Sequence, residues 1–418
     1  MNPTIKARIE SIRRGEVPEG YKRTKAGIMP VPWCKEKTYQ AKDLFVSVSD
    51  KKHGGTMEVL SATQDRGIVP RRLVDIDIKY DDSNLGTYKK VDKGDFVISL
   101  RSFQGGIEYS DYVGIVSPAY TVVRSKQKIV SGYYKAYFKT EDFIKRLNIG
   151  TYGIRDGKQV SFDDFGDMVL HYPPVNEQEK IAEILAGQDR VVELKEKLLA
   201  EKQKQKKYLM QQLLTGKKRL PGFSDEWKNI ELGKCLKSKN QKELPSYKAP
   251  LMAFVADKGI VPKGNKYDRS FLVKNLDKQY KRTDYNDFIY SSNNLDVGSI
   301  GLNLFGSAVI SEVYEVFCVL NGYVPMIVSK IIKLPKNINK IIRFRQGVIY
   351  GQYRIYAEDF LSVIVSMPCF EEQIAIAEIL STADKEIELL KKDIEQEKLK
   401  KKSLMQLLLT GIVRVKDV

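Results

Sequence analysis

The chain has 418 residues, 42% of them hydrophobic, and lysine and arginine outnumber aspartate and glutamate by 70 to 53, a formal charge of +17. This length exceeds what one hydrophobic core usually serves and predicts two or more domains, while the charge favours a polyanionic partner such as nucleic acid over an acidic small molecule. Four widely spaced cysteines without a C-x-x-C pair, and only two histidines, argue against a disulfide framework and a zinc site.

The first segment, MNPTIKARIESIRR, carries charges where a signal peptide needs an apolar core, which predicts a cytoplasmic protein. The most apolar long window begins at Tyr314 and reads YEVFCVLNGYVPMIVSKII. Glu315, Asn321 and Lys330 interrupt it, a pattern that fits two strands and a turn better than a membrane span. No association with a membrane is therefore expected.

Residues 20–172 are rich in short alternating runs such as DFVISL and TVVRS, which predict an α+β domain dominated by strands. Glycine-rich, basic loops separate the runs: VPRR, SLRSFQGG and YGIRDGKQ. Glycine permits close approach of the backbone, and Arg, Lys and Gln bind phosphate or base edges. The candidate DNA contacts in this region are Arg71, Arg72, Arg101, Arg155, Lys158 and Gln159.

A long helix is predicted next. Pro173 and Pro174 bar a helix before them, Asn176 suits an N-cap and Gly216 suits a helix end. Such a helix spans about 40 residues, or roughly 60 Å.

Residues 220–367 form a second strand-rich region, with runs such as DFIYSS and AVISEVYEVF and with loops VPKGNKYDR, SSNN, FRQG and YGQYR. The candidate DNA contacts here are Lys263, Lys266, Arg269, Asn293, Asn294, Arg345, Gln346, Gln352 and Arg354. In both regions the same loops are also compatible with ordinary surface turns.

The chain contains an internal repeat. Residues 177–219 match residues 372–414 without a gap, including the runs IAEIL, LMQ and LLTG in both copies. Upstream, DRGIVP answers DKGIVP and GDFVIS answers NDFIYS, so each long helix follows a related strand-rich region. YGIRDGKQ and YGQYR occupy overlapping places but differ in their polar residues, which predicts one framework with two reading surfaces and hence two different half-sites.

Apolar residues recur every seven positions in both predicted helices, although the middle of the seam is polar. Two near-copies associate most simply about a two-fold axis, which would place the helices antiparallel, side by side. The alternative is that each helix packs only on its own domain. The candidate helix-pairing residues are Leu185, Val192, Leu199, Leu213, Leu380, Ile387, Ile394 and Leu408.

A second repeated apolar stripe falls outside this seam and predicts either docking of other subunits or contact with the adjoining domains. Its residues are Leu194, Met210, Leu214, Leu389, Met405 and Leu409.

PPVNEQEKIAEIL, the duplicated LMQ-x-LLTG ending and the two variable regions together resemble the specificity subunit of type I restriction-modification systems, over essentially the whole chain. The resemblance implies an α+β chain with two pseudo-symmetric target recognition domains separated by two long antiparallel coiled-coil helices. The expected domains are 1–173 with a short N-terminal helix, 174–217 as the first helix, 218–367, and 368–418 as the second helix. The second copy departs from the pattern at Cys369, which puts the start of its helix in doubt.

The resemblance further implies an asymmetric, bipartite double-stranded DNA target and docking of two methyltransferase subunits, with room for two restriction subunits. S-adenosylmethionine and ATP with Mg²⁺ would then bind partner subunits, and this chain would bind no cofactor or metal.

The sequence offers no catalytic residues for a self-sufficient enzyme. YPPV at Tyr172 lacks the leading Asn or Asp of an amino-methyltransferase motif, and no phosphate-binding loop of the G-x-x-x-x-G-K-[ST] type occurs. The leading hypothesis is a non-catalytic DNA-recognition subunit. The alternatives are a coiled-coil adaptor whose basic surface is incidental, and a degenerate restriction enzyme, which would need a carboxylate cluster for a metal.

Overall fold

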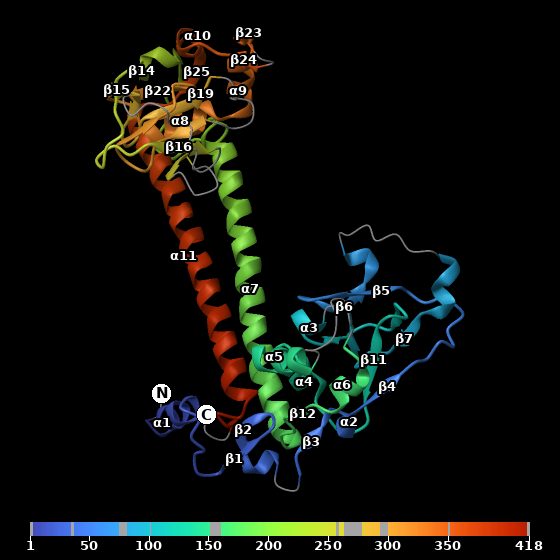
Figure 1. Ribbon diagram of the computed structural model, residues 1–418. Helices are drawn as coiled ribbons and strands as arrows, with labels where there is room; N and C mark the ends of the chain where they lie inside the picture. Colours follow the sequence, from blue (N-terminus) through green and yellow to red (C-terminus); the bar gives the residue numbers. More distant parts are fainter. Residues whose placement is uncertain are drawn as a thin grey trace. The chain divides into compact units, whose positions relative to one another are not determined.

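The computed structural model describes residues 3–34, 37–74, 82–100, 102–150, 160–255, 259–262, 278–292, 300–349 and 352–415. These form two compact units. Unit 1 comprises residues 1–196 and 392–418, and unit 2 comprises residues 197–391. Both ends of the chain therefore belong to unit 1, and each long helix contributes one part to each unit (Figure 1).

The two long helices are α7 (Val175–Leu213) and α11 (Phe370–Leu408), each of 39 residues. The carbonyl of Pro174 accepts from the backbone N–H groups of Glu177 and Gln178, and the carbonyl of Cys369 takes the same place for Gln373. The helical bond needs only a carbonyl at this position, so Cys369 does not disturb the start of α11.

The prediction that Asn176 caps α7 is wrong, because Asn176 lies inside the first turn. Both helices end before a glycine with a positive φ, 70° at Gly216 and 72° at Gly411, as the sequence predicted.

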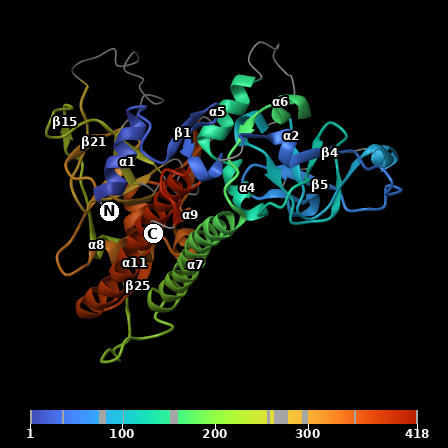
Figure 2. The same cartoon turned by 90° about the horizontal axis from the view of Figure 1, so that it is seen from below.

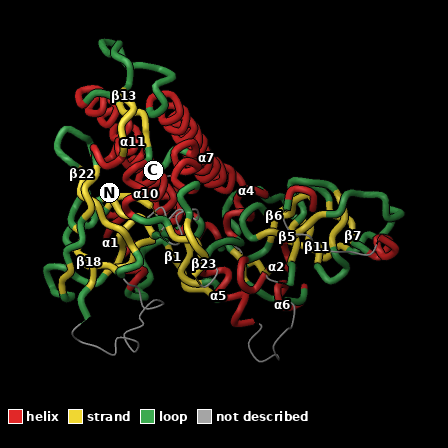
Figure 3. The backbone as a smooth tube through the Cα atoms, turned by 90° about the horizontal axis from the view of Figure 1, so that it is seen from above, coloured by secondary structure: helices red, strands yellow, loops and turns green. Residues whose placement is uncertain are grey.

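Unit 1 is built around a four-stranded antiparallel sheet in the order β4-β11-β8-β9. Its strands are β1 (Tyr21–Thr24), β2 (Gly27–Pro30), β3 (Tyr39–Gln40), β4 (Phe45–Val48), β5 (Leu60–Thr63), β6 (Gly67–Pro70), β7 (Lys89–Val91), β8 (Phe96–Ile98), β9 (Glu108–Tyr109), β10 (Gly114–Val116), β11 (Thr121–Ser125) and β12 (Val169–Leu170). Its shorter helices are α1 (Pro3–Arg13), α2 (Ala41–Leu44), α3 (Ser102–Gly105), α4 (Ser131–Tyr137), α5 (Glu141–Gly150) and α6 (Phe162–Gly166). Figure 2 shows α2 and α6 close together beside β4, and Figure 3 shows β5 and β6 side by side.

Unit 2 repeats this plan with a sheet in the order β14-β22-β19-β20. Its strands are β13 (Lys228–Glu231), β14 (Leu236–Ser238), β15 (Lys242–Glu243), β16 (Met252–Val255), β17 (Gly259–Pro262), β18 (Tyr280–Thr283), β19 (Phe288–Ser291), β20 (Ile300–Leu302), β21 (Ala308–Ile310), β22 (Tyr314–Val319), β23 (Gln346–Ile349), β24 (Gln352–Arg354) and β25 (Ile364–Met367). Its shorter helices are α8 (Pro325–Ile332), α9 (Pro335–Ile342) and α10 (Ala357–Ser362).

The prediction of two strands and a turn from Tyr314 is correct only for its first half. β22 forms as expected, but residues 325–332 form α8, which begins with Pro325 at a position where a helix tolerates proline. Ile327, Val328 and Ile331 are buried in the core of unit 2. A short apolar run that is buried on most sides has no period that separates helix from strand, which explains the error.

The repeated short motifs form the same turns in both units. In unit 1 Asp92 and Asp95 bracket a turn at Gly94, where φ is 100°, and in unit 2 Asp284 and Asp287 bracket a turn at Asn286, where φ is 68°. Each turn is closed by a backbone N–H that donates to the carboxylate three residues later. The framework is therefore duplicated down to its hydrogen bonds.

Each core contains one end of each long helix. In unit 1 Ile181, Leu185, Leu408 and Leu409 join an aromatic cluster around Phe45. In unit 2 Leu213, Leu214, Ile376 and Leu380 join a cluster of aromatic and aliphatic side chains. Burial of such side chains stabilises each unit by about 1.5–3 kcal/mol per residue. Within the described residues, no helix combines the length and apolar character that a membrane crossing requires.

Candidate nucleic-acid interface

Two of the predicted reading segments of unit 2 meet at the end of hairpin β23–β24. The backbone N–H of Ile355 donates to the carbonyl of Ser292 at 3.1 Å, and the hydroxyl of Tyr290 donates to the carbonyl of Ile355 at 3.1 Å. Ser292 directly follows β19 and Ile355 directly follows β24, so the bond between them brings the ends of the two strands together. Asn293 and Asn294 follow Ser292 in the sequence and lie outside the described residues.

The described candidate side chains of this hairpin contact acidic and aromatic neighbours. The Nη2 atom of Arg354 is 3.6 Å from Glu315, and its guanidinium lies 5.0 Å from the centre of the Tyr356 ring. Gln346 donates from Nε2 to Asp359 at 2.7 Å. Arg345 immediately precedes β23 and is half-buried.

In unit 1, Arg71 and Arg72 lie in a short 3-10 segment directly after β6. Arg71 donates from Nε to Ser61 at 3.3 Å, and Arg72 donates from Nε to Glu58 at 2.7 Å. Gln352 is the first residue of β24. The other candidates lie outside the described residues, and they are Arg101, Arg155, Lys158, Gln159, Lys263, Lys266, Arg269, Asn293 and Asn294.

The acidic turns of the framework are neutralised inside each unit. Arg124 binds Asp92 and Asp95, while Lys239 binds Asp284 and Asp287 at 2.7 Å each. Burial alone would raise the pKa of Asp284, but hydrogen bonds from Arg282, Lys239 and Ser307 outweigh burial and hold this pKa below its usual range. These carboxylates are therefore paired with basic side chains of their own unit.

The long helices contact each other through ion pairs in both units. In unit 1 Lys195 lies 2.8 Å from Asp393 and 2.8 Å from Glu397, and Lys401 pairs with Asp189. Hydrogen bonds from Lys195 and then Gln188 lower the pKa of Glu397 to about 2.

In unit 2 the corresponding contacts are Lys202 with Glu386 at 2.8 Å and Lys206 with Asp384. Within each unit, the residue numbers of the α11 partners fall as those of α7 rise, so the two helices run antiparallel there.

The residues proposed for helix pairing are buried along α11, whereas in α7 they are buried at the ends and half-buried in the middle. Leu185 and Leu408 lie in the core of unit 1, Leu213 and Leu380 in the core of unit 2, and Val192 and Leu199 are half-buried. Ile387 and Ile394 are also buried.

The docking stripe separates into exposed and buried members. Leu194 and Leu389 are 49% and 66% exposed and remain candidates for contact with another subunit. Leu214 and Leu409 are buried in the cores of units 2 and 1, so the prediction that they dock partners is wrong. The chain turns inward where each helix ends, and this turn carries both leucines into their own unit. Met210 and Met405 pack partly against the same cores.

Sequence reasoning missed the role of the repeated Glu-Gln pair at the helix starts. Gln178 accepts from the N–H of Val130 at 2.9 Å and donates to Pro173 at 2.8 Å. Gln373 makes the same two bonds, with Val324 and Pro368. The sequence did carry a signal for this role, because the Glu-Gln pair is identical in both copies of the repeat. Polar residues that become buried need hydrogen-bond partners, and in a repeat those partners are repeated as well.

The two glutamates of this pair are also buried. Glu177 accepts from Arg414 and from Nε1 of Trp33, and Glu372 accepts from Arg219 and from Nε1 of Trp227, the two indole bonds each being 2.9 Å. We call each set a helix-start joint.

His171 lies next to the joint of unit 1 and is buried. Its Nδ1 lies 2.8 Å from the carbonyl of Leu409, and its Nε2 lies 3.2 Å from the carbonyl of Ala26. Burial lowers the pKa of His171 and outweighs the two carbonyl contacts, which favour the protonated ring. His171 thus connects segments from both ends of the chain.

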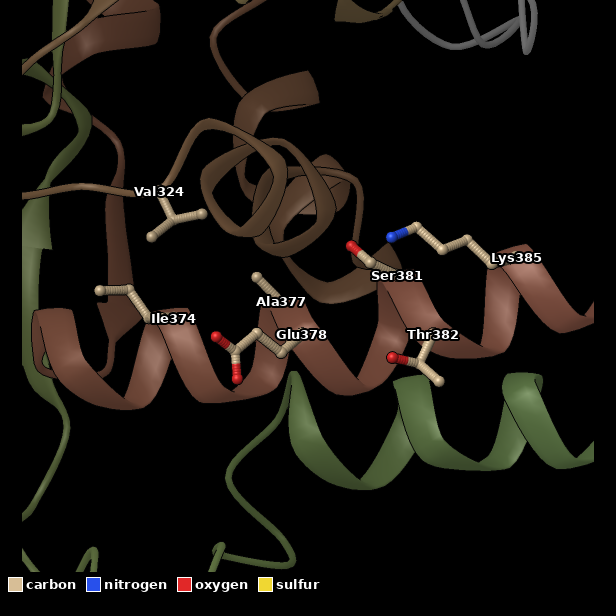
Figure 4. A pocket seen from close by; sticks show the side chains of 7 residues that line it. All are labelled: Val324, Ile374, Ala377, Glu378, Ser381, Thr382 and Lys385. Carbon is tan, nitrogen blue, oxygen red and sulfur yellow. The ribbon is translucent and has the colours of Figure 1, made fainter.

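The structure offers no evident catalytic constellation in the part of the chain that it describes. No group of three or more His, Cys, Asp and Glu side chains there is arranged to hold a metal ion. A cavity of about 280 Å³ in unit 2 is lined by Val324, Ile374, Ala377, Glu378, Ser381, Thr382 and Lys385 (Figure 4). The hydroxyl of Ser381, one of the two hydroxyl groups in this lining, donates to Sδ of Met326 and not to a base.

Comparisons with known proteins agree with this geometry. Residues 34–204 match a sequence family described as "Type I restriction modification DNA specificity domain". The putative type I restriction enzyme MjaX specificity subunit of Methanocaldococcus jannaschii is 26% identical, over 95% of this chain and 97% of that protein. The MjaVIII specificity subunit of the same organism is 24% identical, over 78% of this chain and 81% of that protein.

Solved structures share the fold. The HsdS subunit of Thermoanaerobacter tengcongensis superposes with a TM-score of 0.54 at 16% identity, over 95% of this chain and 98% of that one. A chain from a structural study of complex assembly and conformational transition of the type I restriction-modification system gives a TM-score of 0.56 at 15% identity, over 95% and 100%.

Proposed function

We propose that this chain, a member of the family of type I restriction-modification specificity subunits, recognises an asymmetric, bipartite DNA sequence, with one half-site for each unit. The observation that carries the proposal is a duplicated framework with two different surfaces. The sheet order and the acidic turns are the same in both units, whereas the basic and amide side chains at their loops differ. Two unlike readers on one scaffold fit a target with two unlike halves.

The long helices would set the distance between the half-sites. Each has 39 residues, or roughly 58 Å at about 1.5 Å per residue. The antiparallel ion pairs in each unit support this role, because they oppose sliding of one helix along the other. Insertion of whole helical turns between Leu185 and Leu213, with matching turns in α11, is expected to lengthen the unread gap without changing either half-site.

Catalysis would belong to partner subunits. We expect two methyltransferase subunits that bind S-adenosylmethionine, and in a full system two restriction subunits that use ATP and Mg²⁺. Exposed Leu194 and Leu389 are candidates for their docking. The chain itself would supply recognition and assembly only.

The test is to purify the chain with and without a methyltransferase subunit and to measure sequence-specific adenine methylation of double-stranded DNA. Methylation is expected only for the complex. Methylation by the isolated chain would refute the assignment of catalysis to the partner.

A coiled-coil adaptor with an incidental basic surface is the second candidate. It is favoured by one observation, the internal pairing of Arg72, Gln346 and Arg354 with acidic side chains. DNA affinity that falls steeply with rising salt and depends on sequence would exclude the adaptor, because its contacts would be neither numerous nor selective.

A further inference from the structure

One buried carboxylate beneath hairpin β23–β24 contacts two cations from two other strands. Glu315 on β22 is 8% exposed. Its Oε2 is 2.7 Å from Nζ of Lys281 on β18, and its Oε1 is 3.6 Å from Nη2 of Arg354 on β24. Lys281 is equally buried at 8%, whereas the side chain of Arg354 is 42% exposed.

We propose that Glu315 is a positioning residue that orients Arg354 for base recognition by unit 2. The inference rests on the proposed function and adds a specificity determinant to it. Arg354 is held from one side by the carboxylate and from another by the face of Tyr356, 5.0 Å away. A guanidinium restrained in this way loses less conformational freedom when it forms a bidentate bond to a base.

Lys281 lowers the free-energy cost of burying the carboxylate of Glu315. Burial of a lone carboxylate is costly, and an ammonium group at 2.7 Å offsets much of that cost. With one oxygen bound by Lys281, the other oxygen of Glu315 is directed to Arg354. The exposed part of Arg354 remains accessible to a ligand.

The backbone next to Arg354 is held by hydrogen bonds that do not involve Glu315. The role of Glu315 in orienting the Arg354 side chain is therefore distinct from stabilisation of the hairpin. Ile355 follows Arg354 directly and is bonded to Ser292 and Tyr290. Glu315 is therefore not needed to hold the end of the hairpin, and its contact acts on the side chain of Arg354.

The experiment uses the full chain in complex with methyltransferase subunits and selects bound duplexes from a pool of random double-stranded DNA. The chains compared are the wild type, Glu315→Gln, Arg354→Ala and the double variant. We expect Glu315→Gln to broaden one half-site and to lower affinity for the wild-type sequence, by a factor within the range of about fivefold to 150-fold for loss of a bidentate base contact. Arg354→Ala should broaden the same half-site, and the double variant should be no worse than Arg354→Ala.

Glu312→Gln is the matched control. Glu312 lies three residues away, and it too forms a 2.7 Å ion pair with a lysine, Lys242, but on the exposed surface. The substitution removes the same charge from the same unit and should leave both half-sites unchanged. Thermal unfolding of the chain in a Trp33→Phe background, followed by Trp227 fluorescence, checks that Glu315→Gln retains the fold of unit 2.

Arg354→Lys keeps the test decisive if Glu315→Gln does not fold. Lysine retains the charge but not the planar fork, so the same half-site should broaden. Half-sites that stay unchanged in Arg354→Lys and Arg354→Ala would overturn the inference, as would additive losses in the double variant. A wild-type complex that selects no sequence would instead refute the proposed function itself.

Discussion

The two helix-start joints have the same chemistry but differ in how the chain supplies it. In unit 2, Arg219 and Trp227 follow α7 in one continuous stretch and bind Glu372. In unit 1, Glu177 binds Arg414 and Trp33, which come from opposite ends of the chain. The two donors of unit 1 are therefore separated by most of the chain, whereas those of unit 2 lie close together in the sequence.

Bringing together donors that are far apart in the chain carries a larger entropic cost than bringing together near neighbours, because a longer loop must be closed. Unit 1 has additional bonds at this place. Tyr21 donates from its hydroxyl to Gly411 at 2.9 Å, Tyr133 donates to Leu409 at 3.3 Å, and His171 contacts Leu409 and Ala26. Unit 1 thus adds further bonds to the duplicated motif, at a joint whose two donors are far apart in the sequence.

The largest expected effect is the loss of either buried carboxylate. Glu177→Ala should destabilise unit 1, and Glu372→Ala unit 2, by about 3–5 kcal/mol each, because an arginine is left without its partner. The chain has two tryptophans, one at each joint, so each unit has its own fluorescent reporter. Unfolding of unit 1 is measured in a Trp227→Phe background and unfolding of unit 2 in a Trp33→Phe background.

The matched control is Glu193→Ala, which removes a carboxylate from the exposed ion pair with Arg190. It should change stability by less than about 1 kcal/mol. Equal losses for Glu193→Ala and Glu177→Ala would contradict the importance of the buried joint.

A smaller difference is expected at the glycines that follow the helices. A Cβ on Gly411 would lie 2.6 Å from Pro30 and 2.8 Å from Trp33, whereas a Cβ on Gly216 would lie 3.5 Å from Trp227. Both positions have a positive φ, so alanine costs about 1–2 kcal/mol at each, and overpacking adds about 1–3 kcal/mol at Gly411 alone. Urea unfolding of Gly411→Ala and Gly216→Ala, read by the tryptophan of each unit, measures the contrast; equal losses would show that the joint of unit 1 is no tighter.

The pH dependence should differ between the units. Burial lowers the pKa of His171 in folded unit 1. Below about pH 6.5, His171 therefore binds a proton more readily in the unfolded chain than in the folded one. Stability of unit 1 should therefore fall as pH falls, by at most about 1.4 kcal/mol per pH unit from this group. Thermal unfolding at about pH 7.5 and about pH 5.5 is compared for the wild type and His171→Gln; a pH effect of the same size in both would exclude His171 as its source.

The smallest effect is expected where the units are most alike. Lys206 with Asp384 in unit 2 and Lys401 with Asp189 in unit 1 are equivalent pairs on partly exposed helix surfaces. Lys206→Ala and Lys401→Ala should each cost about 0.2–1 kcal/mol, less at high salt. A loss that persists in about 1 M salt would show that these lysines act through packing rather than charge.

The sequence predicted the architecture well wherever a signal was long or repeated. Both long helices, their glycine ends and the two related α+β regions follow from periodicity and from the internal match, and the fold comparisons agree. The predictions were wrong where the apolar pattern was short or where the residues lie in a core. Residues 325–332 form α8 rather than a strand, and Leu214 and Leu409 lie in cores rather than on a docking surface.

The candidate DNA contacts were chosen by residue type and loop context, and they stay predictions. For the candidate contacts that it describes, the structure shows the neighbouring side chains, such as Glu315 beside Arg354 and Glu58 beside Arg72. A residue type shows what a side chain is able to bind, but only the fold shows which acidic group it contacts first.

By itself the sequence determined the duplication, the length of the helices and the basic character of the loops, because each of these is written in neighbouring or periodically spaced residues. Only the tertiary structure decided that Trp33 and Arg414 meet on Glu177, and that His171 lies between the two ends of the chain. Contacts between residues hundreds of positions apart depend on how whole elements pack, and local periodicity carries no record of that packing.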